Sequence, residues 1–167
     1  QGDSIHQGGV VSLVIIDYGM GNLRSVQKGF EQVGASATVS SDPKVIHEAT
    51  KLVLPGVGAF PDCMKNLQKR KLIDPILKSI EGKKPLLGIC LGFQVLFDES
   101  EEFGIHKGLG VLRGRVVRFR LSRKYKVPHM GWNRIIKKRR IPFLAEVPDN
   151  TYFYFVHSYY VVPEDEA

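Results

Sequence analysis

The sequence predicts an α/β fold in which a mostly parallel sheet is flanked by helices and extended by added antiparallel strands. Short β-branched apolar runs alternate with segments of helical periodicity up to about residue 100. Glycine-rich turns follow several of these runs, and a cysteine between two glycines follows the last one. This alternation is typical of right-handed βαβ units, which place helices on both faces of a parallel sheet.

The expected elements follow one another in a regular order. A buried strand at 10–16 ends in a loop where Asn22 is well placed to cap a helix. Leu23 begins the apolar stripe of that helix, and Gly34 stops it. The further expected elements are a strand at 37–39, a brief helix opened by Asp42 and Pro43, a strand at 52–54, helices from Phe60 and Leu72, and a strand at 85–89.

Beyond residue 100 the pattern changes to short β segments separated by turns. They cover 110–120, 127–136 and 152–162, and we expect them to be antiparallel strands added to the sheet. We found no internal repeat and no linker that would split the chain, so 10–167 is expected to form one domain. Residues 1–9 are polar and glycine-rich, and we interpret them as a disordered tail or the remnant of a purification tag.

Composition narrows the class of protein. The 167 residues contain no apolar run near the ~20 residues of a membrane span and no secretory leader, so a cytoplasmic protein is expected. Cys63 and Cys90 lie far apart, and their spacing predicts neither a metal site nor a disulfide framework. The net charge of +7 is concentrated in basic zones at 113–126 and 137–140, which contain no recognisable nucleic-acid-binding motif. We interpret these zones as solvated or subunit-docking surface rather than a nucleic-acid site.

Cys90 is the most informative residue of the chain. Gly88 and Gly92 flank its immediate neighbours, an apolar strand precedes it, and Phe93 to Phe97 is expected to begin a helix. A nucleophile on such a strand-to-helix turn is a nucleophile elbow, and the helix N-terminus favours the thiolate. Cys63, on an expected helix, is interpreted as structural.

A thiolate that attacks a carbonyl carbon also needs an oxyanion hole and a base. The N–H of Leu91 is in the right place for one oxyanion donor, and Val57, in the turn after the strand at 52–54, is a candidate for the second. Gln94 lies one turn beyond Cys90, where it could clamp a polar substrate or be solvated. Glu99, Glu101 and Glu102 are expected to be solvated.

The histidines supply no convincing base. Of the five, His129 and His157 lie among aromatic residues, and neither is followed two residues later by an acid. We therefore interpret both as packed, hydrogen-bonded side chains.

Several segments together resemble a known family. The sequence around Cys90, GICLGFQ, resembles the nucleophile motif of class I (triad) glutamine amidotransferases, which have a flavodoxin-like fold, and PGVG at 55–58 resembles their oxyanion strand. DYGMGNL at 17–23, PHMGWN at 128–133 and YFYFVHSY at 152–159 resemble the glutaminase subunit family of imidazole glycerol phosphate synthase.

The resemblance implies a reaction, a partner and site residues. Glutamine would be hydrolysed through a Cys90 thioester, without a metal or organic cofactor. The ammonia would pass to a (β/α)₈-barrel cyclase subunit in a heterodimer of histidine biosynthesis. The implied oxyanion donors are Val57 and Leu91, the implied glutamine-binding residues are Gly56, Gly58, Gln94, Ser158 and Tyr159, and the implied partner-facing residues are Asn22, His129 and Trp132.

The sequence departs from the family in one respect. The family completes its triad with a His-Pro-Glu segment near the C-terminus, and the 167 residues contain no His-x-Glu. We expect a longer protein that is represented in part. The alternatives are a catalytically inactive partner-binding module and the glutaminase subunit of a different synthase.

Overall fold

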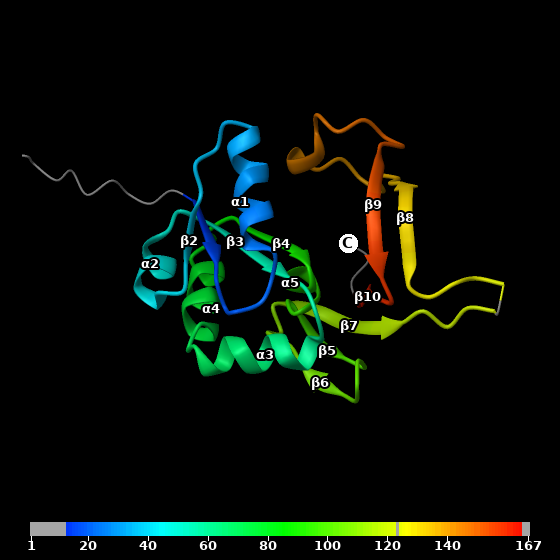
Figure 1. The fold of residues 1–167 in the computed structure, drawn as a ribbon, viewed down its shortest axis with the longest axis horizontal. Helices are drawn as coiled ribbons and strands as arrows, with labels where there is room; N and C mark the ends of the chain where they lie inside the picture. The colour runs from blue at the N-terminus through cyan, green and yellow to red at the C-terminus, as the bar shows by residue number, and fades with distance from the viewer. Residues whose placement is uncertain (1–12, 123, 165–167) are drawn as a thin grey trace, which may run out of the picture. The chain divides into compact units, whose positions relative to one another are not determined.

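The computed structural model describes residues 13–122 and 124–164, whose elements are labelled in Figure 1. Their contacts divide into two units, one of residues 13–116 with 161–164 and one of residues 117–160. The tail expected at 1–9 and the start of the strand expected at 10–16 lie outside the described residues. The single domain expected over 10–167 stays a prediction.

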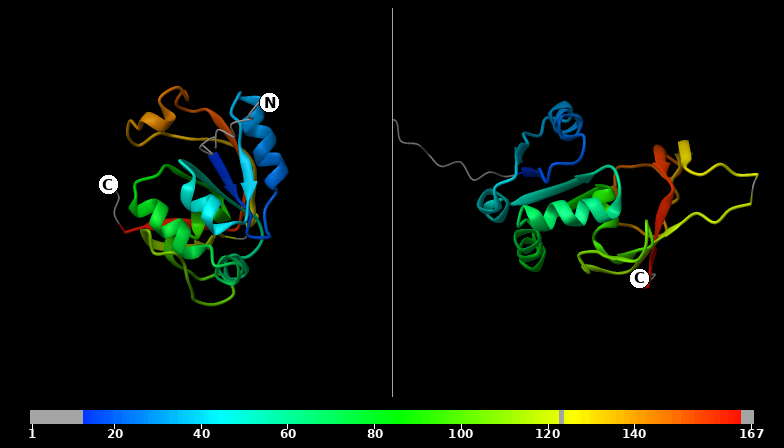
Figure 2. Two further views of the ribbon diagram at one scale, coloured as in Figure 1. Left: turned by 90° about the vertical axis from the view of Figure 1, so that its left-hand side faces the viewer. Right: turned by 60° about the horizontal axis from the view of Figure 1, so that its bottom comes forward.

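The first unit contains a four-stranded parallel sheet in the order β2-β1-β3-β4. Helix α1 covers one face of this sheet, and α2, α3 and α4 lie on the other (Figure 2). The α/β class predicted from the sequence is therefore confirmed. The strands are β1 (Leu13–Ile16), β2 (Thr38–Ser40), β3 (Lys51–Gly56) and β4 (Leu86–Cys90), and the helices are α1 (Leu23–Gln32), α2 (Pro43–Glu48), α3 (Phe60–Lys69) and α4 (Ile73–Glu81).

The two central strands of the sheet, β1 and β3, are buried on both faces. Successive side chains of a strand point to opposite faces, so an almost continuous apolar run is needed where both faces are covered. Ile15 and Val53 pack with Val26 and Phe30 of α1 on one face. The alternate strand residues Val14, Ile16, Leu52 and Leu54 are also buried.

The predicted helix caps are present. The Asn22 side chain accepts a hydrogen bond from the Ser25 N–H at 3.3 Å and begins α1. The Asp42 side chain accepts one from the Lys44 N–H at 2.8 Å and begins α2. Both caps satisfy backbone donors that the first turn of a helix leaves without partners.

The later strands form sheets of their own instead of lengthening the parallel sheet, which corrects the expected arrangement. One sheet has the order β10-β7-β5-β6 and the other pairs β8 with β9. The pair β8–β9 is antiparallel as expected. Strands β5 and β6, which the sequence analysis did not predict, are also antiparallel, whereas β5 and β7 are parallel. The elements are β5 (Phe97–Ser100), β6 (His106–Lys107), β7 (Leu112–Arg118), β8 (His129–Arg134), the 3₁₀ turn η1 (Pro142–Leu144), β9 (Tyr152–His157) and β10 (Tyr159–Pro163).

Candidate active site

Cys90 occupies the turn that the sequence predicted. It ends β4 and directly precedes the short helix α5 (Leu91–Gln94), with φ 54° and ψ −115°. A positive φ is uncommon for a residue other than glycine and costs free energy unless the surroundings enforce it. The side chain is exposed. A strained turn that presents an accessible thiol is the geometry of a nucleophile elbow, so the predicted strand-to-helix turn is confirmed, whereas the role of Cys90 as the nucleophile stays a prediction.

The two glycines are required because backbones approach closely at the turn. A Cβ on Gly92 would overlap the carbonyl oxygen of Leu54 in β3. A Cβ on Gly88 would lie 2.7 Å from the Cα of Phe93. Any larger residue at either position would push α5 away from the sheet.

The helix after Cys90 is shorter than the sequence suggested. It covers four residues, and Phe97 already begins β5. The backbone after Gln94 is held by the segment at 108–112: Leu109 donates to the carbonyl of Val95, and Val111 donates to that of Leu96. These non-local hydrogen bonds replace the next helical turn.

The end of β3 lies beside the elbow. Gly56 is the register partner of Cys90 in the parallel pair β3–β4. Val57 follows with 52% of its surface exposed, whereas Leu91, directly after Cys90, is buried. The structure thus brings together the cysteine and the backbone of both predicted oxyanion donors at the carboxyl ends of parallel strands, where α/β sheets carry their sites.

Tyr18 is a residue near this turn that sequence reasoning missed. It is fully buried, and its hydroxyl oxygen lies 2.7 Å from the position that a Cβ of Gly56 would take. Burial raises the pKa of Tyr18 above its usual value, and the Cys63 and Cys90 thiols raise it further. The signal that could have found it is a tyrosine, a large side chain with a polar end, within the glycine-rich loop that follows β1.

Cys63 is buried, whereas Cys90 is exposed. Cys63 lies on α3 with no exposed surface, and burial raises the pKa of its thiol to about 11. A buried neutral thiol behaves as a small hydrophobe, so the structural interpretation is confirmed.

Glu102 is not a solvated residue, and that expectation was wrong. Its Oε2 accepts a hydrogen bond from the N–H of Phe60 at 2.8 Å, and the pair is partly buried. Ala59, at the N-cap of α3, offers no side-chain acceptor, so a carboxylate from distant sequence takes that role. Glu102 thereby fixes the start of the helix that follows the glycine-rich turn at 55–58.

The remaining predicted site residues of the first unit lie on nearby elements. Gln94 is the last residue of α5 and is half-buried. Asn22 lies in the loop that follows β1, at the carboxyl end of that strand. Gly58 lies two residues beyond the end of β3 and has a φ of +92°.

The second unit carries the other predicted residues on or directly after the antiparallel pair β8–β9, which is called the hairpin below. His129 and Trp132 are on β8, and Ser158 and Tyr159 lie at the junction of β9 and β10. Trp132 is 70% exposed, and its ring packs edge-on against Tyr154 at 5.7 Å.

The histidines of this hairpin are packed, as predicted. The Nδ1 of His157 lies 2.8 Å from the carbonyl oxygen of Tyr159, so this nitrogen carries the hydrogen that it donates. The His129 ring packs against His157 with a centroid distance of 5.6 Å. Phe119 packs against the His157 ring with a centroid distance of 5.1 Å.

Two further features bear on the class of site. Across residues 13–122 and 124–164, no group of three or more acidic, histidine or cysteine side chains is arranged to hold a metal ion. Within the same residues, no helix combines the length and the apolar character needed to cross a bilayer.

Comparison with known proteins identifies the family. The model of the class I glutamine amidotransferases matches residues 14–167. The chain is 59% identical over 160 residues to a protein of Syntrophotalea carbinolica, covering 93% of this chain and 78% of that protein. It is 55% identical over 163 residues to one of Geobacter sulfurreducens, covering 95% and 78%. Both relatives carry the name imidazole glycerol phosphate synthase subunit HisH.

Solved structures support the same fold. One crystal structure of a glutamine amidotransferase matches with a TM-score of 0.68 and 19% identity, covering 92% of this chain and 75% of that one. A glutamine amidotransferase from Thermotoga maritima matches with a TM-score of 0.60 and 20% identity, covering 93% and 64%. With its elbow, its fold and these relatives in agreement, the chain belongs to the class I glutamine amidotransferases, in the family of imidazole glycerol phosphate synthase subunit HisH.

Proposed function

We propose that this chain hydrolyses glutamine to glutamate and ammonia and delivers the ammonia to a (β/α)₈-barrel cyclase subunit. The cyclase would form imidazole glycerol phosphate and an aminoimidazole carboxamide ribotide in the cytoplasm, as a step of histidine biosynthesis. The observation that carries the proposal is the exposed Cys90 at a positive φ, with Gly56 as its register partner. The relatives favour this synthase over others that use glutamine.

The reaction follows from a thiolate beside backbone donors. The Cys90 sulfur attacks the side-chain carboxamide carbon of glutamine, and the carbonyl electrons move to the oxygen. The N–H groups of Val57 and Leu91 donate to that oxyanion. Its collapse breaks the C–N bond, and the nitrogen leaves as ammonia after taking up a proton. Water then hydrolyses the thioester, which releases glutamate and restores the thiol.

We assign binding of the glutamine to residues near the turn and to two residues at the junction of β9 and β10. The backbone of Gly56 and Gly58 would approach the substrate without side-chain hindrance, and the amide of Gln94 would bind its polar groups. Ser158 and Tyr159 would complete the substrate contacts.

The partner-facing residues in this proposal are Asn22, His129 and Trp132. An exposed tryptophan is the side chain most typical of an energetically important interface position. Trp132 is 70% exposed, so this side chain has most of its surface available for a partner. We expect low glutaminase activity without the cyclase, because events at the partner would orient the Gly56–Val57 peptide.

The test is a comparison of two nitrogen sources. Cys90→Ala in the complete complex should abolish synthesis from glutamine and leave synthesis from added ammonium salt unchanged, because the cyclase site is untouched. Tyr125→Phe, an exposed change in the loop between β7 and β8, is the control and should alter neither rate. Glutamine-dependent synthesis that persists in Cys90→Ala would refute the proposal.

A further inference from the structure

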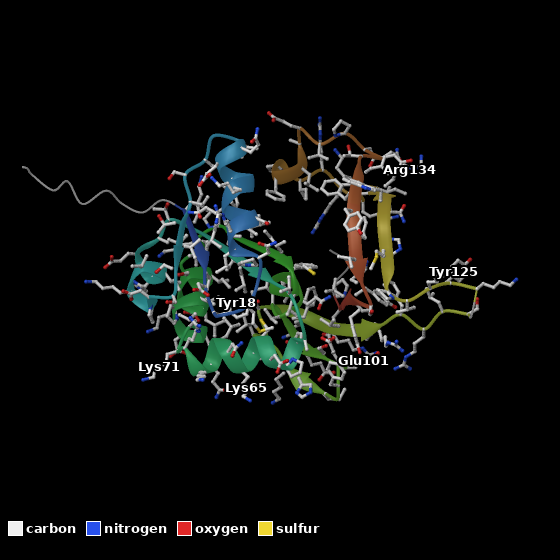
Figure 3. All side chains as sticks on the ribbon, in the orientation of Figure 1. Tyr18, Lys65, Lys71, Glu101, Tyr125 and Arg134 are labelled. Atoms are coloured by element: carbon white, nitrogen blue, oxygen red, sulfur yellow. The ribbon has the colours of Figure 1, made fainter. Side chains whose placement is uncertain are left out.

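The Tyr18 hydroxyl is a buried polar group without a partner. The residue is 0% exposed, and among the described residues its hydroxyl oxygen makes no hydrogen bond. The Cys63 thiol is near it, on α3, but a thiol is a weak partner, and the geometry falls outside that of a hydrogen bond. Figure 3 shows the tyrosine next to α3, on the side of the sheet that this helix covers. Such groups are rare in folded proteins, and each one calls for an explanation.

The position of this hydroxyl connects it to the site. The place that a Cβ of Gly56 would occupy lies 2.7 Å from the Tyr18 oxygen, 2.7 Å from the Gly92 nitrogen and 2.8 Å from the Leu91 Cβ. The hydroxyl therefore stands against the end of β3 and the beginning of α5. A tyrosine is accommodated there because position 56 has no side chain.

The oxyanion hole requires a particular orientation of the Gly56–Val57 peptide. A peptide unit is planar, and its N–H and C=O point in opposite directions. When the Val57 N–H turns toward the substrate oxygen, the carbonyl of Gly56 must turn away from it. A buried backbone carbonyl needs a donor, and the hydroxyl of Tyr18 adjoins the backbone of Gly56.

We propose that Tyr18 is a positioning residue whose hydroxyl donates a hydrogen bond to the Gly56 carbonyl when the Val57 N–H faces the oxyanion. The inference rests on the proposed glutaminase function and adds to it a hydrogen bond that orients the Gly56–Val57 peptide. In the described structure the hydroxyl has no partner, so a turn of the Gly56–Val57 peptide gives the buried donor an acceptor. The bond favours the orientation that the tetrahedral intermediate requires.

The test is Tyr18→Phe in the complete protein bound to its cyclase partner. This change removes the hydroxyl and keeps the ring. We expect kcat for glutamine hydrolysis to fall about tenfold, the factor that corresponds to ~1.4 kcal/mol, with KM changed less than twofold. Synthesis from ammonium salt should stay unchanged. The Tm should not fall, because the substitution removes a buried group that lacks a partner.

Two controls make the outcome decisive. Tyr125→Phe removes an exposed tyrosine hydroxyl from the loop between β7 and β8 (Figure 3) and should leave every rate unchanged. Wild-type activity in Tyr18→Phe would overturn the inference. A fall in Tm accompanied by equal losses with glutamine and ammonia would overturn it as well. If glutamine-dependent synthesis survives Cys90→Ala, the proposed function itself is refuted, which distinguishes the two failures.

Discussion

The two units of the molecule differ in how their apolar side chains are used. The buried hydrophobic residues of the described chain run from Val14 to Val116, all within the first unit. No described residue between 117 and 160 is buried. Instead, Trp132, Phe143 and Tyr154 are 70%, 72% and 55% exposed.

This difference indicates two sources of stability. The parallel sheet buries its own core, and the strained turn at Cys90 is held between backbones that cannot move independently. The hairpin holds together by the pairing of β8 with β9 and by ring contacts such as Trp132 against Tyr154 at 5.7 Å. Large exposed apolar surface is typical of a protein interface, which agrees with the proposed docking of Trp132 to a cyclase.

The strongest test of this comparison is a pair of glycine substitutions. In Gly92→Ala the new methyl group would overlap the Leu54 carbonyl, so we expect a loss of about 3 kcal/mol or more in the free energy of unfolding. Gly131→Ala, in β8, meets no atom within 4 Å. Its φ of +142° still strains an alanine, so we expect a loss of roughly 1–2 kcal/mol.

Urea unfolding followed by two signals measures both changes. Far-ultraviolet circular dichroism reports mainly on the α-helices of the first unit, and the fluorescence of Trp132, the single tryptophan, reports on the hairpin. Equal losses in the two variants would show that the backbone of the hairpin is packed as tightly as the elbow.

A pair of valine substitutions gives a smaller effect of the same kind. Val53 in β3 is 1% exposed, and Val156 in β9 is 50% exposed. Val53→Ala should cost about 2 kcal/mol through two lost methyl groups and the cavity that they leave. Val156→Ala should stay within about 0.5 kcal/mol of the wild type. The same urea titration measures both, and a cost above 1 kcal/mol for Val156→Ala would contradict the comparison.

The features that sequence predicted correctly depend on local patterns. The apolar runs, the caps at Asn22 and Asp42 and the elbow each follow from residues within a few positions of one another. The strands at the carboxyl edge then bring Gly56 beside Cys90 through the general rule for parallel sheets.

The features that sequence missed depend on contacts between distant segments. Helix α5 stops after four residues because the backbone at 108–112 takes up the carbonyls that would continue it. Glu102 caps a helix that begins 42 residues earlier. The hydroxyl of Tyr18 lies against Gly56, and the spacing of apolar residues in the sequence does not predict this proximity. Such contacts become visible when the sheet brings the segments together.

The last prediction sharpens the comparison within the first unit, where burial also separates the two cysteines. Iodoacetamide at pH 8 should alkylate Cys90 and leave Cys63 unmodified in the folded protein, as measured by mass spectrometry of the peptides. The reagent reacts with accessible thiolate, and Cys63 is fully buried with its pKa raised to about 11. In urea both cysteines should react at similar rates, because unfolding exposes Cys63 and restores its ordinary pKa. Modification of Cys63 at the rate of Cys90 in the native protein would show that α3 opens readily, and the first unit would then lack the rigid core that holds the elbow.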